Sequence, residues 1–473
     1  MRIVYFSVGM GSTIHGSTAL AARLQADGHQ VTIVSVASME GACAAAGVDF
    51  VRLESFDQHR DRLRALTRAR NEHRLSPAAW IRWLRACLAL RRESLELREC
   101  RTLLVREAPD LVLADVEAHL GILLTLALDL PCALVSFFFD MRRHSTVPHL
   151  QSTLGLPTSL AERFRVAMSH RLLSLRSLWW RTTTRYSVTA LRQRLAPIRY
   201  RSVEAGELIQ LAKALELPLQ PRIATDQWLR PWMYRDLPTM SLTLADLDFS
   251  VPPSHPIAQP RYVGPMLTND RPEVRLSKED VERLGSFISD EVDGAGRTLI
   301  YCGLGTYLSA NPQVLSALVE VLRQRSDWAL VVGLGGFESA TSVLARCPQN
   351  VLFLNWAPQL QVLERAAVAV VHGGISSINE CVATSTPMLF CLAGNIDSPG
   401  NVARLVQHGL GRRGRVDDSQ KLLLDLEALI NDHELAARLR QHAAALKAMV
   451  QEKRMEQFVN ELCREHVSGL ALA

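Results

Sequence analysis

Five short apolar runs in the second half of the chain, separated by segments long enough for one helix each, constrain the fold most strongly. They are Thr298–Gly303, Trp328–Gly333, Val351–Leu354, Val368–Val371 and Pro387–Cys391. These runs do not alternate polar with apolar residues, so each is expected to be a strand buried on both faces, as in a parallel sheet covered by helices. The pattern predicts an α/β domain with a doubly wound parallel sheet.

The first half of the chain opens with the same rhythm. A strand over Arg2–Ser7 precedes a glycine-rich turn, a helix over about Thr18–Asp27 and a second strand over Gln30–Val36. Two further apolar runs, Pro109–Asp115 and Cys132–Phe139, fit buried strands. This order predicts a second parallel-sheet domain of the same class.

A chain of 473 residues is too long for one core, because single cores stop growing near ~250–300 residues. Prolines concentrate in the run Leu237–Pro265, which favours an extended crossing between two domains. We expect an N-terminal domain over residues 1–266, a C-terminal domain over 267–444 and a C-terminal helix over 445–473.

The cysteines and the apolar segments predict a cytoplasmic protein. The nine cysteines are scattered and form no CxxC pair, which argues for reduced thiols and against a disulfide framework or a zinc site. The first residues lack the long apolar core of a secretion signal. The apolar stretch Gly121–Phe139 contains Asp129 and Pro131, so a core helix followed by a buried strand is expected rather than a membrane span.

A glycine cluster follows the first expected strand. Gly9, Gly11 and Thr13 lie where backbone amides can approach a ligand at the start of a helix. The cluster fails as a dinucleotide fingerprint, because Ile14 occupies the third glycine position and no acidic residue ends the second strand. A dehydrogenase is therefore disfavoured, while a structural turn and a substrate site both stay open.

The C-terminal half carries an ordered set of motifs. NWAPQ over 355–359 precedes HGGISSINE over 372–380, and DSPGN over 397–401 precedes GLG at 409–411. The chain here resembles the nucleotide-sugar signature of glycosyltransferase family one. The sixteen-residue interval from Trp356 to His372 is similar to the bacterial macrolide and small-molecule members. YCGLGT, ending at Thr306, resembles the strand-to-loop motif of that family.

This resemblance implies the GT-B fold, in which two doubly wound Rossmann-like domains face a cleft and the C-terminal helix packs back on the N-terminal domain. It implies an inverting transfer of a hexose from a UDP- or dTDP-sugar to a small-molecule acceptor. The nucleotide sugar is a co-substrate, and we expect neither a metal nor another cofactor.

The resemblance also assigns a donor site, and the residue types suit it. Diphosphate needs hydrogen-bond donors and the positive end of a helix dipole, the base needs an aromatic platform, and ribose hydroxyls need a carboxylate. The expected donor-site residues are Thr306, Trp356, Ala357, Gln359, His372, Gly374, Ser376, Ser377, Glu380, Asp397 and Ser398. Asp397 and Ser398 replace the usual Asp-Gln or Glu-Gln pair that binds the hexose, so the sugar need not be glucose.

The catalytic base is the weakest part of the resemblance. Family members keep a His or Asp in the first glycine turn, and Thr13 occupies that slot here. A shifted turn puts His15 in the role, with Asp115 as its orienting partner. Alternatively, His15 faces solvent, and an acceptor that is already ionised needs no base.

Basic residues are unevenly distributed. The segment Arg163–Arg201 contains ten arginines and no acidic residue, interleaved with Leu and Trp. These arginines can form an ordinary solvated face. Alternatively, they form a surface that binds an anionic or lipophilic acceptor, or the inner face of an anionic membrane. A second basic stretch, Arg60–Arg106, can line the same opening. No recognition motif supports nucleic acid binding.

Two alternatives to a transferase stay open. A sugar-nucleotide epimerase shares the fold and a diphosphate site. A non-catalytic partner subunit that binds a nucleotide sugar would also explain the altered glycine turn.

Overall fold

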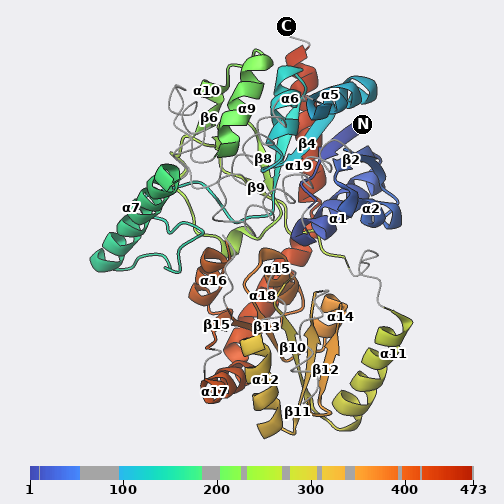
Figure 1. Cartoon of the computed structure of the whole chain (residues 1–473), viewed down its shortest axis with the longest axis vertical. Coiled ribbons are helices and arrows are strands. Elements are labelled where there is room, and N and C mark those ends of the chain that lie inside the picture. Colours follow the sequence, from blue (N-terminus) through green and yellow to red (C-terminus); the bar gives the residue numbers. More distant parts are fainter. Residues whose placement is uncertain are drawn as a thin grey trace, which may run out of the picture.

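The N-terminal apolar runs form one seven-stranded parallel sheet with the strand order β3-β2-β1-β4-β5-β8-β9 (Figure 1). The computed structural model describes residues 1–9, 11–53, 95–183, 203–224, 232–268, 277–305, 312–335, 347–391, 397–415 and 418–470. The strands are β1 Arg2–Phe6, β2 Gln30–Ser35, β3 Asp49–Arg52, β4 Leu111–Asp115, β5 Cys132–Ser136, β8 Thr239–Ser241 and β9 Arg261–Tyr262. The order reverses between β1 and β4, which makes the carboxyl ends of these two strands a ligand-binding position.

Helices connect and cover these strands. They are α1 Gly11–Ala26, η1 Ala37–Met39, α2 Glu40–Ala45, α5 Leu95–Glu107, α6 His119–Ala127, α7 Leu160–Thr183, α9 Val203–Ala214, α10 Leu219–Arg222 and η2 Ala245–Leu247. A two-stranded antiparallel sheet, β6 Ile223–Ala224 with β7 Met233–Tyr234, lies beside them. The helix and strand expected over Gly121–Phe139 are α6 and β5.

The start of α1 differs from the expectation. The helix begins at Gly11, not near Thr18, so Thr13 lies in a helix and only Gly9, with φ +61°, forms the turn. Gly16 lies within this helix, and a Cβ at that position would lie 2.4 Å from the Phe137 ring. Close packing, rather than turn geometry, explains this glycine.

The C-terminal runs form a six-stranded parallel sheet with the order β12-β11-β10-β13-β14-β15. Its elements are α11 Lys278–Phe287, η3 Ile288–Gly294, β10 Thr298–Gly303, α12 Pro312–Gln324, β11 Trp328–Gly333, β12 Val351–Leu354, α14 Gln359–Leu363, β13 Val368–Val371, α15 Ile375–Ala383, β14 Met388–Phe390, α16 Ser398–Gln407, β15 Gly411–Arg413 and α17 Ser419–Ile430. The sequence predicted five of these strands and missed β15, which has three residues with only Gly411 buried. The doubly wound fold expected for both halves is confirmed.

The C-terminal tail contains two helices, α18 His433–Gln451 and α19 Arg454–Leu470, rather than one. The chain turns between them at Lys453, which has φ +52°. Met455 and Phe458 of α19 then join the apolar core of the N-terminal sheet. The C-terminal helix therefore packs back on the N-terminal domain, as expected.

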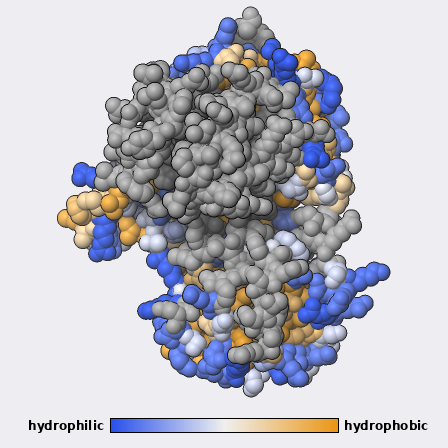
Figure 2. Space-filling model, viewed as in Figure 1, coloured by the Kyte–Doolittle hydropathy of each residue, from blue (hydrophilic) through white to orange (hydrophobic). Residues whose placement is uncertain are grey.

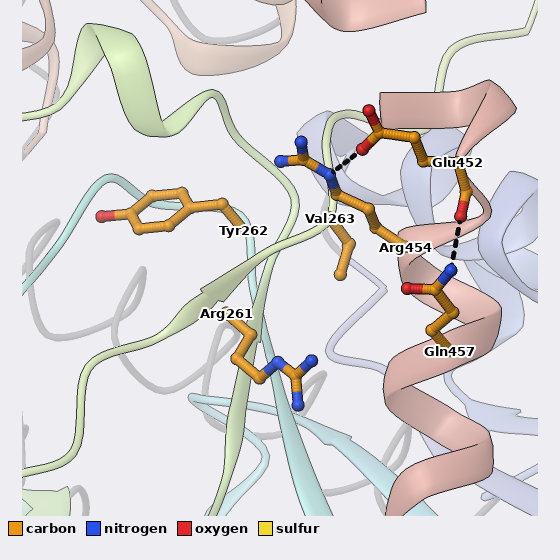
Figure 3. Close-up of a pocket in the computed structure, with 6 residues that line it drawn as sticks. All are labelled: Arg261, Tyr262, Val263, Glu452, Arg454 and Gln457. Carbon is orange, nitrogen blue, oxygen red and sulfur yellow. Dashed lines mark hydrogen bonds and ion pairs between the residues drawn. The ribbon is translucent and has the colours of Figure 1, made fainter. Parts of the chain in front are cut away.

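The chain crosses between its two halves twice, once after β9 and once between α18 and α19, and the two crossings lie side by side. The segment after β9 lies beside the end of α18, where a Cβ on Gly264 would be 3.7 Å from Met449. A cavity of about 390 Å³ opens here, lined by Arg261, Tyr262, Val263, Glu452, Arg454 and Gln457 (Figure 3). Arg261 pairs with Glu461 and Arg454 with Glu452, so both cations of this cavity already have carboxylate partners.

Helix α7 projects from the body of the N-terminal half (Figure 1). Its first turns expose apolar and basic side chains together, and Figure 2 shows hydrophobic and hydrophilic surface side by side at that position. Within the described residues, no helix has both the length and the apolar composition to cross a bilayer.

Candidate functional site

The expected donor residues gather at the carboxyl edge of the C-terminal sheet. The loops after β10, β12 and β13 all leave this edge, and the strand order reverses between β10 and β13. Ligands of open parallel sheets bind at such a reversal. Thr306 follows β10 but lies outside the described residues.

His372 is held by two glycines. It follows β13 and is 8% exposed. A Cβ on Gly305, which has φ +75°, would lie 2.5 Å from the His372 Cε1, and a Cβ on Gly374 would lie 2.4 Å from Nε2. Burial lowers the pKa of His372, and the Gly303 backbone opposes this shift. Burial therefore favours the neutral form of the ring, and a side chain at position 305 or 374 would collide with it.

A chain of hydrogen bonds joins three elements of the site. The Tyr301 hydroxyl on β10 donates to the Gln359 Oε1 at 3.0 Å, and the Gln359 Nε2 donates to the Ser377 Oγ at 3.2 Å. Gln359 is the first residue of α14 and follows Trp356, Ala357 and Pro358, which are all half-buried. The structure thus brings two expected residues, Gln359 and Ser377, into contact, and adds Tyr301.

Helix α15 presents its N-terminus at the same edge. Gly374 is the N-cap residue, and as a glycine it has no side chain with which to cap the helix. The first-turn amides, including those of Ser376 and Ser377, therefore combine hydrogen-bond donors with the positive end of the helix dipole. Glu380 lies one turn further along α15, 3% exposed, on the same face as Ser377.

Asp397 and Ser398 open helix α16 next to the glycine turn. Asp397 is the N-cap residue, and its Oδ2 accepts from the Asn401 Nδ2 at 2.8 Å. The same amide donates to the Gly373 carbonyl at 3.1 Å. Burial raises the pKa of Asp397, while Asn401 lowers it. Ser398 is fully buried. Asn401, within the DSPGN motif, was not assigned a role from the sequence.

Asp115 lies at the carboxyl end of β4 in a buried polar cluster. Its carboxylate accepts from the Tyr5 hydroxyl at 2.5 Å, the Ser7 hydroxyl at 3.0 Å and the Val8 amide at 2.8 Å. The Ser17 hydroxyl contacts both hydroxyls at 3.0 Å. Burial raises the pKa of Asp115 from 3.8 to about 6, and these hydrogen bonds lower it.

The position of His15 relative to this cluster follows from helix geometry. His15 is half-buried and precedes Ser17 by two residues on α1. Residues two apart on a helix do not share a face, whereas Thr13 and Ser17, four apart, do. The face of α1 that meets the Asp115 cluster is thus that of Thr13 and Ser17. The pairing of His15 with Asp115 stays a prediction.

Curated proteins that resemble this chain in sequence are named as glycosyltransferases. No protein-family model matches the chain. It is 29% identical to the oleandomycin glycosyltransferase of Streptomyces antibioticus, over 31% of this chain and 34% of that protein. It is 24% identical to the zeaxanthin glucosyltransferase of Pantoea ananas, over 74% of this chain and 73% of that protein. The chain thus spans about a third of the first relative and most of the second.

Solved structures agree across nearly the whole chain. The glycotransferase of kitacinnamycin has a TM-score of 0.64 at 22% identity, covering 98% of both chains. The glycosyltransferase VinC in complex with dTDP has a TM-score of 0.58 at 15% identity, covering 98% of this chain and 99% of that chain. The chain is thus similar to proteins that are named as glycosyltransferases. Its fold is the GT-B fold expected from the sequence.

Proposed function

We propose that this protein transfers a hexose from a UDP- or dTDP-sugar to a small-molecule acceptor, with inversion at the anomeric carbon. The arrangement of His372 between two glycines, beside the N-terminus of α15 with Gly374 as its N-cap residue, supports this proposal most directly. VinC binds dTDP in its solved structure. An anion needs such donors, and a helix N-terminus supplies them without a metal.

In this mechanism the acceptor oxygen attacks the anomeric carbon from the face opposite the diphosphate. The bond between that carbon and the diphosphate oxygen breaks, and the nucleoside diphosphate leaves with the electron pair. His372 and the α15 amides stabilise the charge that develops on the leaving oxygen. Asp397 binds hydroxyls of the hexose, and Glu380 binds the ribose hydroxyls. Trp356 stacks on the nucleobase of the donor.

We propose that His15 removes the proton from the acceptor, with Asp115 as orienting partner once the His15 ring turns toward the Thr13 and Ser17 face of α1. Neutral imidazole accepts a proton near pH 7, which a threonine hydroxyl such as that of Thr13 does not. An ionised acceptor, such as a carboxylate, would attack without a base. The relatives are named for oleandomycin and zeaxanthin, which favours a small, lipophilic acceptor here. Relatives named as transferases do not favour the epimerase alternative.

Nucleotide binding tests this proposal. Titration of UDP and dTDP into the protein should give binding, and the ligand at ~100 times its Kd should stabilise the fold by about 2.7 kcal/mol. His372→Ala should weaken that binding roughly ten-fold or more through the lost hydrogen bond. His433→Ala, an exposed histidine of α18, is the matched control. Equal nucleotide affinity in both variants would contradict the assignment.

A second experiment measures turnover of the donor with and without an acceptor. Donor turnover that requires an acceptor would exclude the epimerase and the non-catalytic subunit.

We further propose a cytoplasmic location with peripheral contact to an anionic membrane through α7. Leu160, Phe164 and Leu172 are 82%, 65% and 58% exposed. The exposed Arg163, Arg165 and Arg171 lie among them. Glu162, the acidic residue of the first turn, accepts from Thr158 and Ser159 at the helix start. Clustered arginine with apolar residues suits an anionic bilayer surface. The rest of the two basic stretches lies partly outside the described residues.

Vesicle sedimentation tests this contact. The protein should pellet with vesicles of phosphatidylglycerol at low salt, less at high salt, and not with phosphatidylcholine vesicles. Phe164→Glu should reduce pelleting, whereas Val281→Glu, exposed on α11, should not. Equal binding to both vesicle types would leave the arginines as an ordinary solvated face.

A further inference from the structure

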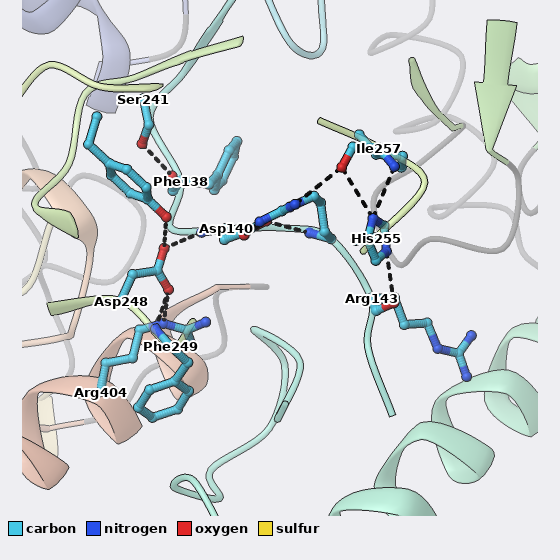
Figure 4. A network of polar contacts seen from close by, with 11 residues as sticks. Phe138, Asp140, Arg143, Ser241, Asp248, Phe249, His255, Ile257 and Arg404 are labelled. Atoms are coloured by element: carbon cyan, nitrogen blue, oxygen red, sulfur yellow. Dashed lines mark hydrogen bonds and ion pairs between the residues drawn. The ribbon is translucent and has the colours of Figure 1, made fainter. Parts of the chain in front are cut away.

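Helix α16 carries a buried arginine that reaches the other half of the molecule. Arg404 is 1% exposed, and its Nε donates to the Asp248 Oδ1 at 2.7 Å (Figure 4). Its Nη1 donates to the Gly400 carbonyl at 3.2 Å within the helix. The guanidinium also lies 4.4 Å from the ring centroid of Phe249 and 5.3 Å from that of Phe139. Three residues of the N-terminal half therefore enclose one cation of the donor half.

Asp248 is itself fixed within the N-terminal half. Its Oδ2 accepts from the Tyr262 hydroxyl at 2.8 Å and from the Asp140 amide at 2.5 Å. Asp140 in turn forms a buried ion pair with Arg142 at 2.6 Å. Figure 4 shows Asp248 between Asp140 and Arg404. With both oxygens engaged, the Asp248 carboxylate has one orientation in which it can meet Arg404.

The N-terminus of α16 touches both halves as well. The Gly400 amide donates to the Leu150 carbonyl at 2.7 Å, and a Cβ on Gly400 would lie 2.4 Å from the Leu150 Cα. One residue on, Asn401 holds Asp397 and the Gly373 carbonyl. Two successive residues thus connect the N-terminal half to the turn that carries His372.

We propose that Arg404 is a positioning residue, whose ion pair with Asp248 sets the placement of α16, and so of Asp397, relative to the acceptor half. This inference rests on the proposed function, because it assumes that the donor sugar meets the α16 N-terminus. A buried ion pair contributes little net stability compared with apolar packing, so its use here is to select one orientation. Transfer across a cleft depends on such placement, since an error of about 1 Å can cost ~10²-fold in rate.

The test compares three variants: Arg404→Met, Arg404→Lys, and a double variant that combines Asp248→Asn with Arg404→Met. The double variant removes both charges of the pair, so it leaves no unpaired buried charge. The measured quantities are kcat and KM for donor turnover, UDP and dTDP affinity, and hydrogen exchange at the Gly400 amide. Arg438→Met is the matched control, because Arg438 donates to the Gly409 carbonyl just beyond α16 without leaving the donor half.

Arg404→Met and the double variant should lower kcat by about 10²-fold and speed exchange at Gly400, with nucleotide affinity within about two-fold of the native value. Arg404→Lys should recover part of kcat, because it keeps the charge without the planar fork. Native kcat and exchange in the double variant would overturn the inference, as would a parallel loss of nucleotide affinity. Absence of nucleotide binding in the native protein would instead overturn the proposed function, and the exchange at Gly400 would still report on the ion pair.

Discussion

The buried carboxyl of Asp115 makes a quantitative prediction about stability and pH. Its pKa rises from 3.8 to about 6 because burial disfavours the charged form. One pKa unit corresponds to about 1.4 kcal/mol, so ionisation of Asp115 in the folded protein costs about 3 kcal/mol of unfolding free energy. The folded state holds the proton more tightly than the unfolded state. Stability from this group is therefore fully present below about pH 4 and lost as the pH rises to about 6 and beyond.

Asp115→Asn removes this dependence. The amide cannot ionise, and the Tyr5 and Ser7 hydroxyls can rotate to accept from it, so the shape of the cluster is kept. Urea unfolding of the native protein and the variant between pH 4 and 8 measures the effect. The free energy of unfolding should fall more with rising pH in the native protein than in Asp115→Asn, by up to about 3 kcal/mol.

The comparison of the two proteins isolates this one group, because burial also raises the pKa of Asp140 and Asp397 and both add to the overall slope. Asp110→Asn, at an exposed carboxylate that accepts from the Arg2 amide, is the matched control for the loss of one carboxylate outside the cluster. Identical slopes for the native protein and Asp115→Asn would refute the assignment of a raised pKa to this residue.

Three further outcomes are expected at the donor and acceptor sites. Gly374→Ala should displace the His372 ring, because the added Cβ would lie 2.4 Å from Nε2. The variant should therefore weaken nucleotide binding at least as much as His372→Ala. Gly285→Ala, at a position with open space around it, is the control and should leave nucleotide binding unchanged in the same titration. His15→Ala should lower turnover by ~10²–10⁴-fold with nucleotide affinity intact, and a fully active variant would transfer the role of base to another group or to the acceptor itself. Turnover measured after dialysis against EDTA should equal the native rate, and a loss that Mg²⁺ restores would contradict metal independence.

The donor half was predictable because its chemistry is local in sequence. Parallel strands end at one edge, so motifs that follow successive strands meet there, and His372, Ser377 and Gln359 do. The carboxylate of Asp397 was also placed near them, but its link through Asn401 to Gly373 depends on how α16 docks against the turn. Periodicity gives no information on that docking.

The N-terminal half was less predictable, because its first glycines favour a turn where the structure has a helix. Glycines at 11 and 16 favour a turn by propensity, yet the helix begins at Gly11. Gly16 is a close-packing position, because a Cβ there would lie 2.4 Å from the ring of Phe137, which is more than a hundred residues away in sequence. The break at Lys453 is similar: the tail contains no proline or glycine there, and the turn exists because α19 must return to the N-terminal core.

The placement of Arg404 shows why the relation between the two halves lies beyond sequence patterns. Its partner Asp248 is 156 residues away, and neither residue belongs to a strand-end motif. In an amphipathic helix an arginine is expected on the solvent face, yet this one lies buried between Phe139 and Phe249. A cation is retained at such a position only with a paired carboxylate, because an unpaired one would cost several kcal/mol. The pair therefore constrains α16 and the N-terminal half at once.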